Sequence, residues 1–299
     1  MRTESMRTEE MSADERDHPA GPGHAEEGSR AEERSHAEER SRTERLRAAG
    51  LPVTDLGPVL AAESDPLLFA TVSGAHLYGF PSRDSDVDLR GAHLLPVAAL
   101  IGLREPEETR SRMGDRDGVE TDLVTHDLRK FVRLMLRRNG YVLEQLLSPL
   151  VVRTSEAHRE LIALAPAVLT SHHAHHYAGF ARTQWRLFER TGELKPLLYT
   201  FRALLTGVHL MRGGGILAHL PTLLQEVAAP GYLPELIAAK AEAEHGPATG
   251  PGRDRLERDV EALRAVLDEA RSATALPGAA VGAGHEALHD FVVRVRLAG

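Results

Sequence analysis

The sequence predicts an α+β fold in which a lobe with strands comes first and an all-helical lobe follows. Three observations support this prediction. Short apolar or alternating runs typical of strands lie between residues 67 and 125, and helical periodicity continues from residue 155 onward. The first 40 residues hold almost no aliphatic side chains. We therefore predict a charged tail at 1–42, a strand-containing domain at 43–152 and a helical domain at 153–299.

The tail is polar, charged and repetitive, cycling through His, Ala, Glu, Arg and Ser. Such a composition cannot fill a core, so we expect the tail to be disordered or at most a fluctuating, solvated helix. The predicted order begins near Leu46, and no function is assigned to the tail.

Three strands are expected next. Residues 67–72 are apolar and end at Ser73-Gly74, which predicts a buried strand that stops at a tight turn. A second strand starts within residues 86–91 and continues to Pro96, and the charged residues 104–118 predict a hairpin-type loop. Residues 119–125 alternate, which predicts a strand with Glu120 and Asp122 on one face.

Helices account for the rest of the chain. Asp127 is a suitable N-cap for an amphipathic helix that ends at Asn139-Gly140, and a second helix runs to Pro149. Further helices are predicted at 156–169, 171–190, 197–211, 221–228, 233–244, 252–272 and 285–297. Arg212-Gly213-Gly214-Gly215 follows a helix, so we interpret it as a helix stop and not as a phosphate loop.

Composition excludes several classes of function. The chain has no cysteine, which rules out disulfides, cysteine-bound zinc, iron–sulfur clusters and a thiol nucleophile, and favours a reducing, cytoplasmic setting. No apolar run approaches the length of a membrane span, so we expect no membrane partner. The net charge is −8 and most of it lies in the tail, so a nucleic-acid partner would need a local basic groove.

The most informative segment is residues 73–91. Asp86 and Asp88 lie one residue apart at the start of a strand, so their carboxylates share a face, and Asp122 on a later strand can join them. Three carboxylates repel one another unless a hard cation neutralises them, and oxygen ligands favour magnesium or manganese. The alternative is that the acidic run serves only turn and capping chemistry.

This segment and those after it resemble a known family. The order S-G-x-x-x-Y-G, S-D-x-D-x-R-G, D-L-x-x-x-D-L-R-K-F and E-x-L-x-S-P is similar to the RNA-repair-associated (RlaP-type) predicted nucleotidyltransferases of the DNA polymerase beta superfamily. The resemblance covers residues 65–150 well and 175–215 more weakly. The matching residues are Ser73, Gly74, Tyr78, Gly79, Ser85, Asp86, Asp88, Arg90, Gly91, Asp122, Asp127, Leu128, Arg129, Lys130, Glu144, Leu146, Ser148 and Pro149.

The resemblance implies a compact nucleotidyltransferase lobe with a mixed sheet, followed by a helical lobe that closes the cleft. It implies a nucleoside triphosphate and two magnesium ions, with transfer of a nucleoside monophosphate to an acceptor hydroxyl and release of pyrophosphate. Asp86 and Asp88 would ligate the metals that hold the triphosphate. Asp122, with Glu120 as the reserve choice, would join the metal that lowers the pKa of the acceptor hydroxyl. The acceptor could be an RNA end, a small molecule or a protein.

One position departs from the superfamily pattern, which places a serine directly after the glycine of the first turn. This chain has Ala75 there. Ser73 and the backbone N–H groups of Gly74 and Ala75 could still hold phosphate oxygens. Two alternatives to an active enzyme follow: a catalytically degraded nucleotide-binding or interaction protein, and a plain structural protein.

Secondary candidates lie on three predicted helices. Lys195, Tyr199 and Arg202 share one side of a helix and are similar to the K-x-x-x-Y-x-x-R pattern of the family's helical lobe, where they would bind the nucleotide; the alternative is an ordinary amphipathic helix. A basic ridge could guide a nucleic-acid backbone or be a solvated face; it comprises Arg129, Arg133 and Arg137. Four histidines cluster at a predicted helix start: His172, His173, His175 and His176. His172 and His176 have the i, i+4 spacing of metal sites but no third ligand, so a helix end is favoured.

Overall fold

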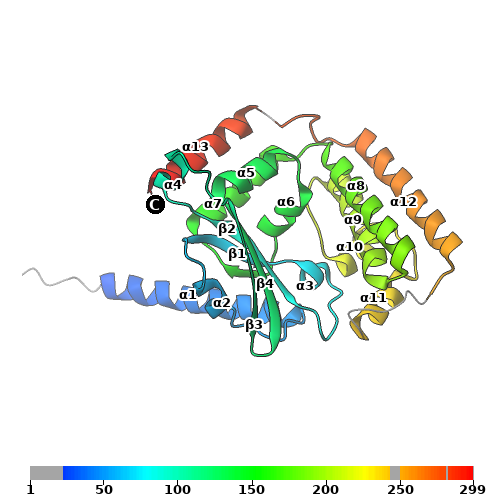
Figure 1. Cartoon of the computed structure of the whole chain (residues 1–299), viewed down its shortest axis with the longest axis horizontal. Coiled ribbons are helices and arrows are strands. Elements are labelled where there is room, and N and C mark those ends of the chain that lie inside the picture. The colour runs from blue at the N-terminus through cyan, green and yellow to red at the C-terminus, as the bar shows by residue number, and fades with distance from the viewer. Residues whose placement is uncertain (1–22, 243–249, 281, 299) are drawn as a thin grey trace, which may run out of the picture. The chain divides into compact units, whose positions relative to one another are not determined.

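The computed structural model describes residues 23–242, 250–280 and 282–298, with side chains from residue 36 onward (Figure 1). The chain divides into two compact units, residues 1–41 and 42–299. Helix α1 (Gly23–Ala48) includes residues 23–42 of the predicted tail, and residues 36–40 of it are exposed. Residues 1–22 lie outside the described part of the chain. None of the described helices combines the length and apolarity that crossing a membrane requires.

The second unit contains a five-stranded sheet in the order β3-β4-β2-β1-β5. Its strands are β1 (Leu67–Val72), β2 (Val87–His93), β3 (Thr109–Arg116), β4 (Val119–Asp127) and β5 (Val151–Arg153). β2 and β4 are parallel and all other neighbours are antiparallel. The sheet is therefore mixed, which confirms the predicted α+β class.

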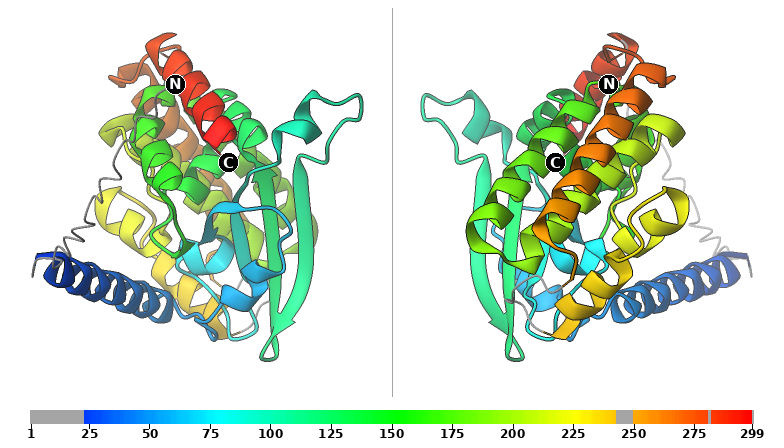
Figure 2. Two further views of the ribbon diagram at one scale, coloured as in Figure 1. Left: turned by 90° about the vertical axis from the view of Figure 1, so that its left-hand side faces the viewer. Right: turned by 90° about the vertical axis from the view of Figure 1, so that its right-hand side faces the viewer.

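The hairpin of β3 and β4 is longer than the sequence indicates. The interpretation of residues 104–118 as a loop was wrong over Thr109–Arg116, where β3 pairs along the whole of β4 and extends the edge of the sheet (Figure 2). β3 is mostly exposed, so its side chains lack the alternation that marks a half-buried strand. Its pairing comes from the two-residue turn at Asp117 and Gly118, both with positive φ, which is the geometry of a tight hairpin.

Short helices surround the sheet: α2 (Gly57–Ala61), α3 (Gly74–Tyr78), α4 (Val97–Ile101), α5 (Leu128–Leu136) and α6 (Gly140–Leu146). Asp127 caps α5 as predicted, because its side chain accepts a hydrogen bond from the backbone N–H of Arg129 (2.9 Å). The predicted tight turn after β1 leads directly into α3, so Ser73 and Gly74 lie where a buried strand becomes a helix.

The remaining helices are α7 (Glu156–Leu164), η1 (Ala165–Val168), α8 (His173–Thr191), α9 (Leu194–Gly213), α10 (Leu220–Glu226), α11 (Leu233–Glu242), α12 (Arg253–Ala273) and α13 (Gly282–Ala298). α9 is almost entirely buried, because α8, α10, α11 and α12 all pack on it. Gly214, in the left-handed region, ends α9 and confirms the predicted helix stop. α13 (red) packs on α5 and α7, beside the sheet (Figures 1 and 2).

Candidate functional site

The parallel register of β2 and β4 brings two of the predicted carboxylates together. Asp88 on β2 lies directly opposite Asp122 on β4. Over residues 87–90 of β2 and 121–127 of β4, buried residues alternate with partly exposed ones, and the two aspartates lie on the partly exposed face. Asp86 precedes β2 by one residue and shares this face by the two-residue period of a strand, and its charge acts on Asp88.

Arg90, on the same face of β2, joins the two aspartates. Its Nη2 atom donates to Asp88 Oδ1 (2.6 Å) and to Asp122 Oδ2 (2.8 Å). The carboxylates are therefore neutralised in part by a guanidinium of the chain itself. Sequence reasoning named Arg90 only as a matching residue of the family motif and gave it no role.

The turn between β1 and α3 closes the site on the side of Asp88. Gly74 has a φ of +61°, and a Cβ atom there would lie 1.8 Å from Asp88 Oδ2. A residue with a side chain would thus displace the carboxylate, so this turn requires glycine. The backbone N–H of Ser73 donates to the Asp88 carbonyl (2.8 Å), which fixes the turn to β2.

Two further positions of this turn bear on ligand binding. The Ser73 hydroxyl is buried, and no hydrogen-bond partner for it exists within the described part of the chain. Ala75 is also buried, so the position where the superfamily places a serine is enclosed and carries no hydroxyl. Ser73 is therefore the hydroxyl that this turn offers in place of the missing one.

The electrostatics of Asp88 reflect its crowded surroundings. Burial raises its pKa above the ordinary value, Arg90 lowers it, and the charges of Asp86 and Asp122 raise it again. Lys195, at the start of α9, also lowers the pKa of Asp88, so its ammonium group acts on the site from the helical lobe. The role in nucleotide binding that the sequence suggests for Lys195 stays a prediction.

Tyr199 and Arg202 lie elsewhere, although they share a helix with Lys195. Tyr199 packs edge-on against Tyr78 and Phe80. Arg202 is only 2% exposed, and its Nη1 donates to Glu144 Oε1 (2.9 Å). Arg202 thus lies inside the core, and the alternative of an ordinary amphipathic helix does not describe its position either.

A buried cluster connects α3, α6 and α9 and comprises Tyr78, Glu144 and Arg202. The Tyr78 hydroxyl donates to Glu144 Oε2 (3.1 Å), and the Arg202 guanidinium lies 3.8 Å from the centre of the Tyr78 ring. Burial and the charge of Glu144 raise the pKa of Tyr78. Two family-motif residues, Tyr78 and Glu144, thus hold α3 and α6 against α9.

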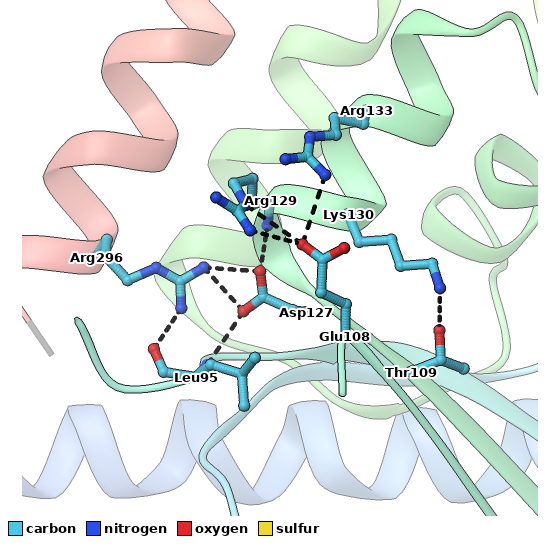
Figure 3. A network of polar contacts seen from close by, with 8 residues as sticks. All are labelled: Leu95, Glu108, Thr109, Asp127, Arg129, Lys130, Arg133 and Arg296. Atoms are coloured by element: carbon cyan, nitrogen blue, oxygen red, sulfur yellow. Dashed lines mark hydrogen bonds and ion pairs between the residues drawn. The ribbon is translucent and has the colours of Figure 1, made fainter. Parts of the chain in front are cut away.

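The predicted basic ridge on α5 is largely paired within the protein. Arg129 donates to Glu108 (3.0 Å), and Arg133 lies 3.5 Å from the same carboxylate (Figure 3). Asp127 accepts two hydrogen bonds from Arg296 of α13, at 2.9 and 2.8 Å (Figure 3). Such pairing favours a structural role for this face over a nucleic-acid groove.

The histidines at the start of α8 do not assemble a ligand set. His173 is buried, and burial lowers its pKa to about 4; the rings of His172 and His175 lie 5.7 Å apart. Throughout the described ranges, no three His, Asp or Glu side chains converge as a metal site would require. The helix-end interpretation of these histidines is therefore favoured.

For a divalent cation, the donors that remain at the site are carboxylate oxygens. Arg90 uses one oxygen of Asp88 and one of Asp122, whereas no described hydrogen bond uses Asp88 Oδ2 or the Asp86 carboxylate. Oxygen donors of this kind suit magnesium or manganese. Asp86 and Asp88 thus fit one such ion, whereas Asp122 shares its Oδ2 atom with Arg90.

Comparison with known proteins identifies the family to which this chain belongs. The model of the RlaP family, described as an RNA repair pathway DNA polymerase beta family, matches residues 53–294. Over 153 residues, 49% of this chain and 61% of the relative, the sequence is 32% identical to the uncharacterized protein MJ0002 of Methanocaldococcus jannaschii. The chain thus spans less than two thirds of that relative.

Among solved structures, a nucleotidyltransferase-like protein from Exiguobacterium sibiricum is 11% identical, with 86% of this chain and 80% of that chain covered and a TM-score of 0.28. A score so low carries no argument about the site. The family match, in contrast, includes the turn at Gly74, both strands with the aspartates and most of the helical lobe. The chain therefore belongs to the RNA repair pathway DNA polymerase beta family.

Proposed function

We propose that the protein is a metal-dependent nucleotidyltransferase, which moves a nucleoside monophosphate from a nucleoside triphosphate to an acceptor hydroxyl and releases pyrophosphate. The observation that carries the proposal is the juxtaposition of Asp88 with the Gly74 turn on one side and Asp122 on the other, in a member of this family. An RNA end is the acceptor that the family description favours.

Each part of the site has a role in this proposal. Asp86 and Asp88 hold magnesium or manganese, which when bound neutralises triphosphate charge and polarises the attacked phosphorus. Ser73 and the backbone N–H groups of Gly74 and Ala75 bind phosphate oxygens. Lys195 adds positive charge on the side of the helical lobe. Arg90 holds Asp88 and Asp122 in fixed positions.

The test is release of pyrophosphate from ATP, GTP, CTP and UTP with magnesium or manganese, with and without total RNA. We expect release by the wild type and at least a 100-fold loss in Asp88→Asn, with the fold kept because the change lowers like-charge repulsion. Asp84→Asn is the matched control, since Asp84 is exposed in the same segment. Silence of the folded wild type with every nucleotide and acceptor would contradict the proposal.

A nucleotide-binding protein without turnover is the second candidate, and Ala75 is the observation that favours it. Such a protein would gain thermal stability from a nucleotide with magnesium, by about 2.7 kcal/mol at a hundredfold excess over Kd, and would release no pyrophosphate. Ala75→Ser should then raise triphosphate affinity. Equal or weaker affinity in that variant would mean that the turn is not degraded.

A further inference from the structure

Arg90 is held by hydrogen bonds at every one of its five N–H positions. Nε donates to the Tyr141 hydroxyl (3.2 Å), and Nη1 donates to the carbonyls of Leu89 (2.8 Å) and Asp122 (2.7 Å). Nη2 supplies the two bonds to the carboxylates of Asp88 and Asp122. The guanidinium is thus fixed to the strands and to α6, and it does not depend on the carboxylates alone for its position.

Arg90 occupies the position that a metal ion bridging the two carboxylates would take. It lies between carboxylates on adjacent parallel strands, and its side chain is 11% exposed while theirs are 21% and 20% exposed. The oxygens that converge on the point between the two strands, Asp88 Oδ1 and Asp122 Oδ2, both accept from Arg90 Nη2, so a divalent ion bridging the carboxylates at that point would compete with Arg90 for both. Because three of the five bonds of Arg90 go to other groups, displacing it would leave a nearly buried charge without its acceptors.

We propose that Arg90 replaces the second metal ion, so that the site binds a single divalent cation, on Asp86 and Asp88. Asp122 is then a positioning residue that orients Arg90 and is not a metal ligand. This inference rests on the proposed function and narrows it, because a guanidinium supplies charge but cannot ligate and acidify an acceptor hydroxyl. Arg90 cannot act as a base either, since a guanidinium in a protein keeps its proton and offers only N–H donors.

The number of bound ions tests the inference directly. Full-length protein is titrated with Mn²⁺ in the presence of a non-hydrolysable ATP analogue, and bound ions are counted by electron paramagnetic resonance, with isothermal titration of the analogue in parallel. The wild type should bind one ion per chain, and Arg90→Gln should bind two, because the neutral side chain frees Asp122. Arg137→Gln, an exposed arginine on the same lobe, is the matched control and should bind one.

Asp122→Asn provides a second variant that does not depend on the folding of Arg90→Gln. It should still bind one ion, with an affinity for Mn²⁺ within about threefold of the wild type. Two ions on the wild type, a single ion on Arg90→Gln with the analogue bound, or loss of the ion in Asp122→Asn would each overturn the inference and leave the proposed function standing. Absence of both ion and analogue from the folded wild type would overturn the two together.

Discussion

Arginine–carboxylate pairs occur in two environments in this protein, and the environments differ in how many of the carboxylate oxygens accept hydrogen bonds. In the closed pairs, Glu144 with Arg202 and Asp127 with Arg296, both oxygens accept hydrogen bonds and every partner is less than 10% exposed. In the open cluster around Arg90, the carboxylates are about one-fifth exposed, and the bond that Arg90 makes to the Asp88 carboxylate uses only Oδ1.

The difference separates structural from functional residues among the family motifs. Glu144 and Asp127 both belong to the matching residues, as do Asp88 and Asp122, so motif membership alone does not distinguish them. Both carboxylate oxygens of the first two accept hydrogen bonds from nearly buried groups of the protein, which identifies Glu144 and Asp127 as structural. Incomplete hydrogen bonding at the partly exposed aspartates identifies the position where an added cation has a place.

The largest effect is expected where a closed pair loses one partner. Arg202→Met leaves the Glu144 carboxylate buried without its cation, so the free energy of unfolding should fall by about 3–5 kcal/mol, as measured by urea denaturation. In the double variant Arg202→Met/Glu144→Gln the loss should be smaller, since no charge remains buried. Arg253→Met, which breaks the exposed pair with Glu189, is the control and should cost under about 0.5 kcal/mol. A loss below about 1 kcal/mol in Arg202→Met would refute this account of the closed pair.

A buried histidine should contribute to the loss of stability in acid. Burial lowers the pKa of His173 from 6.5 to about 4, so its stabilising effect is complete above pH 6.5 and is lost as the pH falls towards 4. Since one pKa unit corresponds to about 1.36 kcal/mol, the loss approaches about 3 kcal/mol. His173→Asn keeps an acceptor for the Thr170 N–H without titrating, and urea denaturation at pH 7 and pH 5 should show a shallower loss than in the wild type. Identical pH dependence in the two proteins would exclude His173 as the source.

Removing the arginine from the other closed pair, Asp127 with Arg296, should cost less stability, because backbone N–H groups also donate to Asp127. In Arg296→Met the carboxylate keeps the backbone N–H groups of Leu95 and Arg129, so we expect a loss of about 2 kcal/mol. Arg294→Met, on the same helix with an exposed partner, serves as the control. If Arg296→Met cost as much as Arg202→Met, the backbone donors would contribute nothing.

Local patterns predicted most of the elements. The apolar run 67–72, the alternation at 119–125, the Asp127 cap and the glycine stop after α9 were all confirmed, because each depends on neighbouring residues. β3 and β5 were missed. β3 has two polar faces and β5 has three residues, so both exist through pairing with strands whose position the local sequence does not encode.

The site was predictable where strand periodicity and family motif agreed, and less so where distant helices meet. The face shared by Asp86 and Asp88 follows from the two-residue period, whereas the pairing of Asp122 with Arg90 depends on the register of parallel strands. Helical spacing placed Lys195 and Arg202 on one side of α9. Only packing decides that the first acts on Asp88 and the second is buried against Glu144, 58 residues away in the sequence.

The smallest change in stability is expected in the open cluster, and a matched pair of variants makes the contrast quantitative. Asp122→Asn leaves Arg90 paired with Asp88, and the new amide oxygen can still accept from Nη2, so the free energy of unfolding should change by less than about 1 kcal/mol. Asp127→Asn makes the same chemical change in a closed pair, where an amide N–H group would face the donors of Arg296 and the backbone, and should cost several times more. Urea denaturation of both variants at pH 7 measures the ratio of the two losses in unfolding free energy. Equal losses would mean that the open cluster contributes to the fold as the closed pairs do, and that its exposed oxygens are no sign of a binding site.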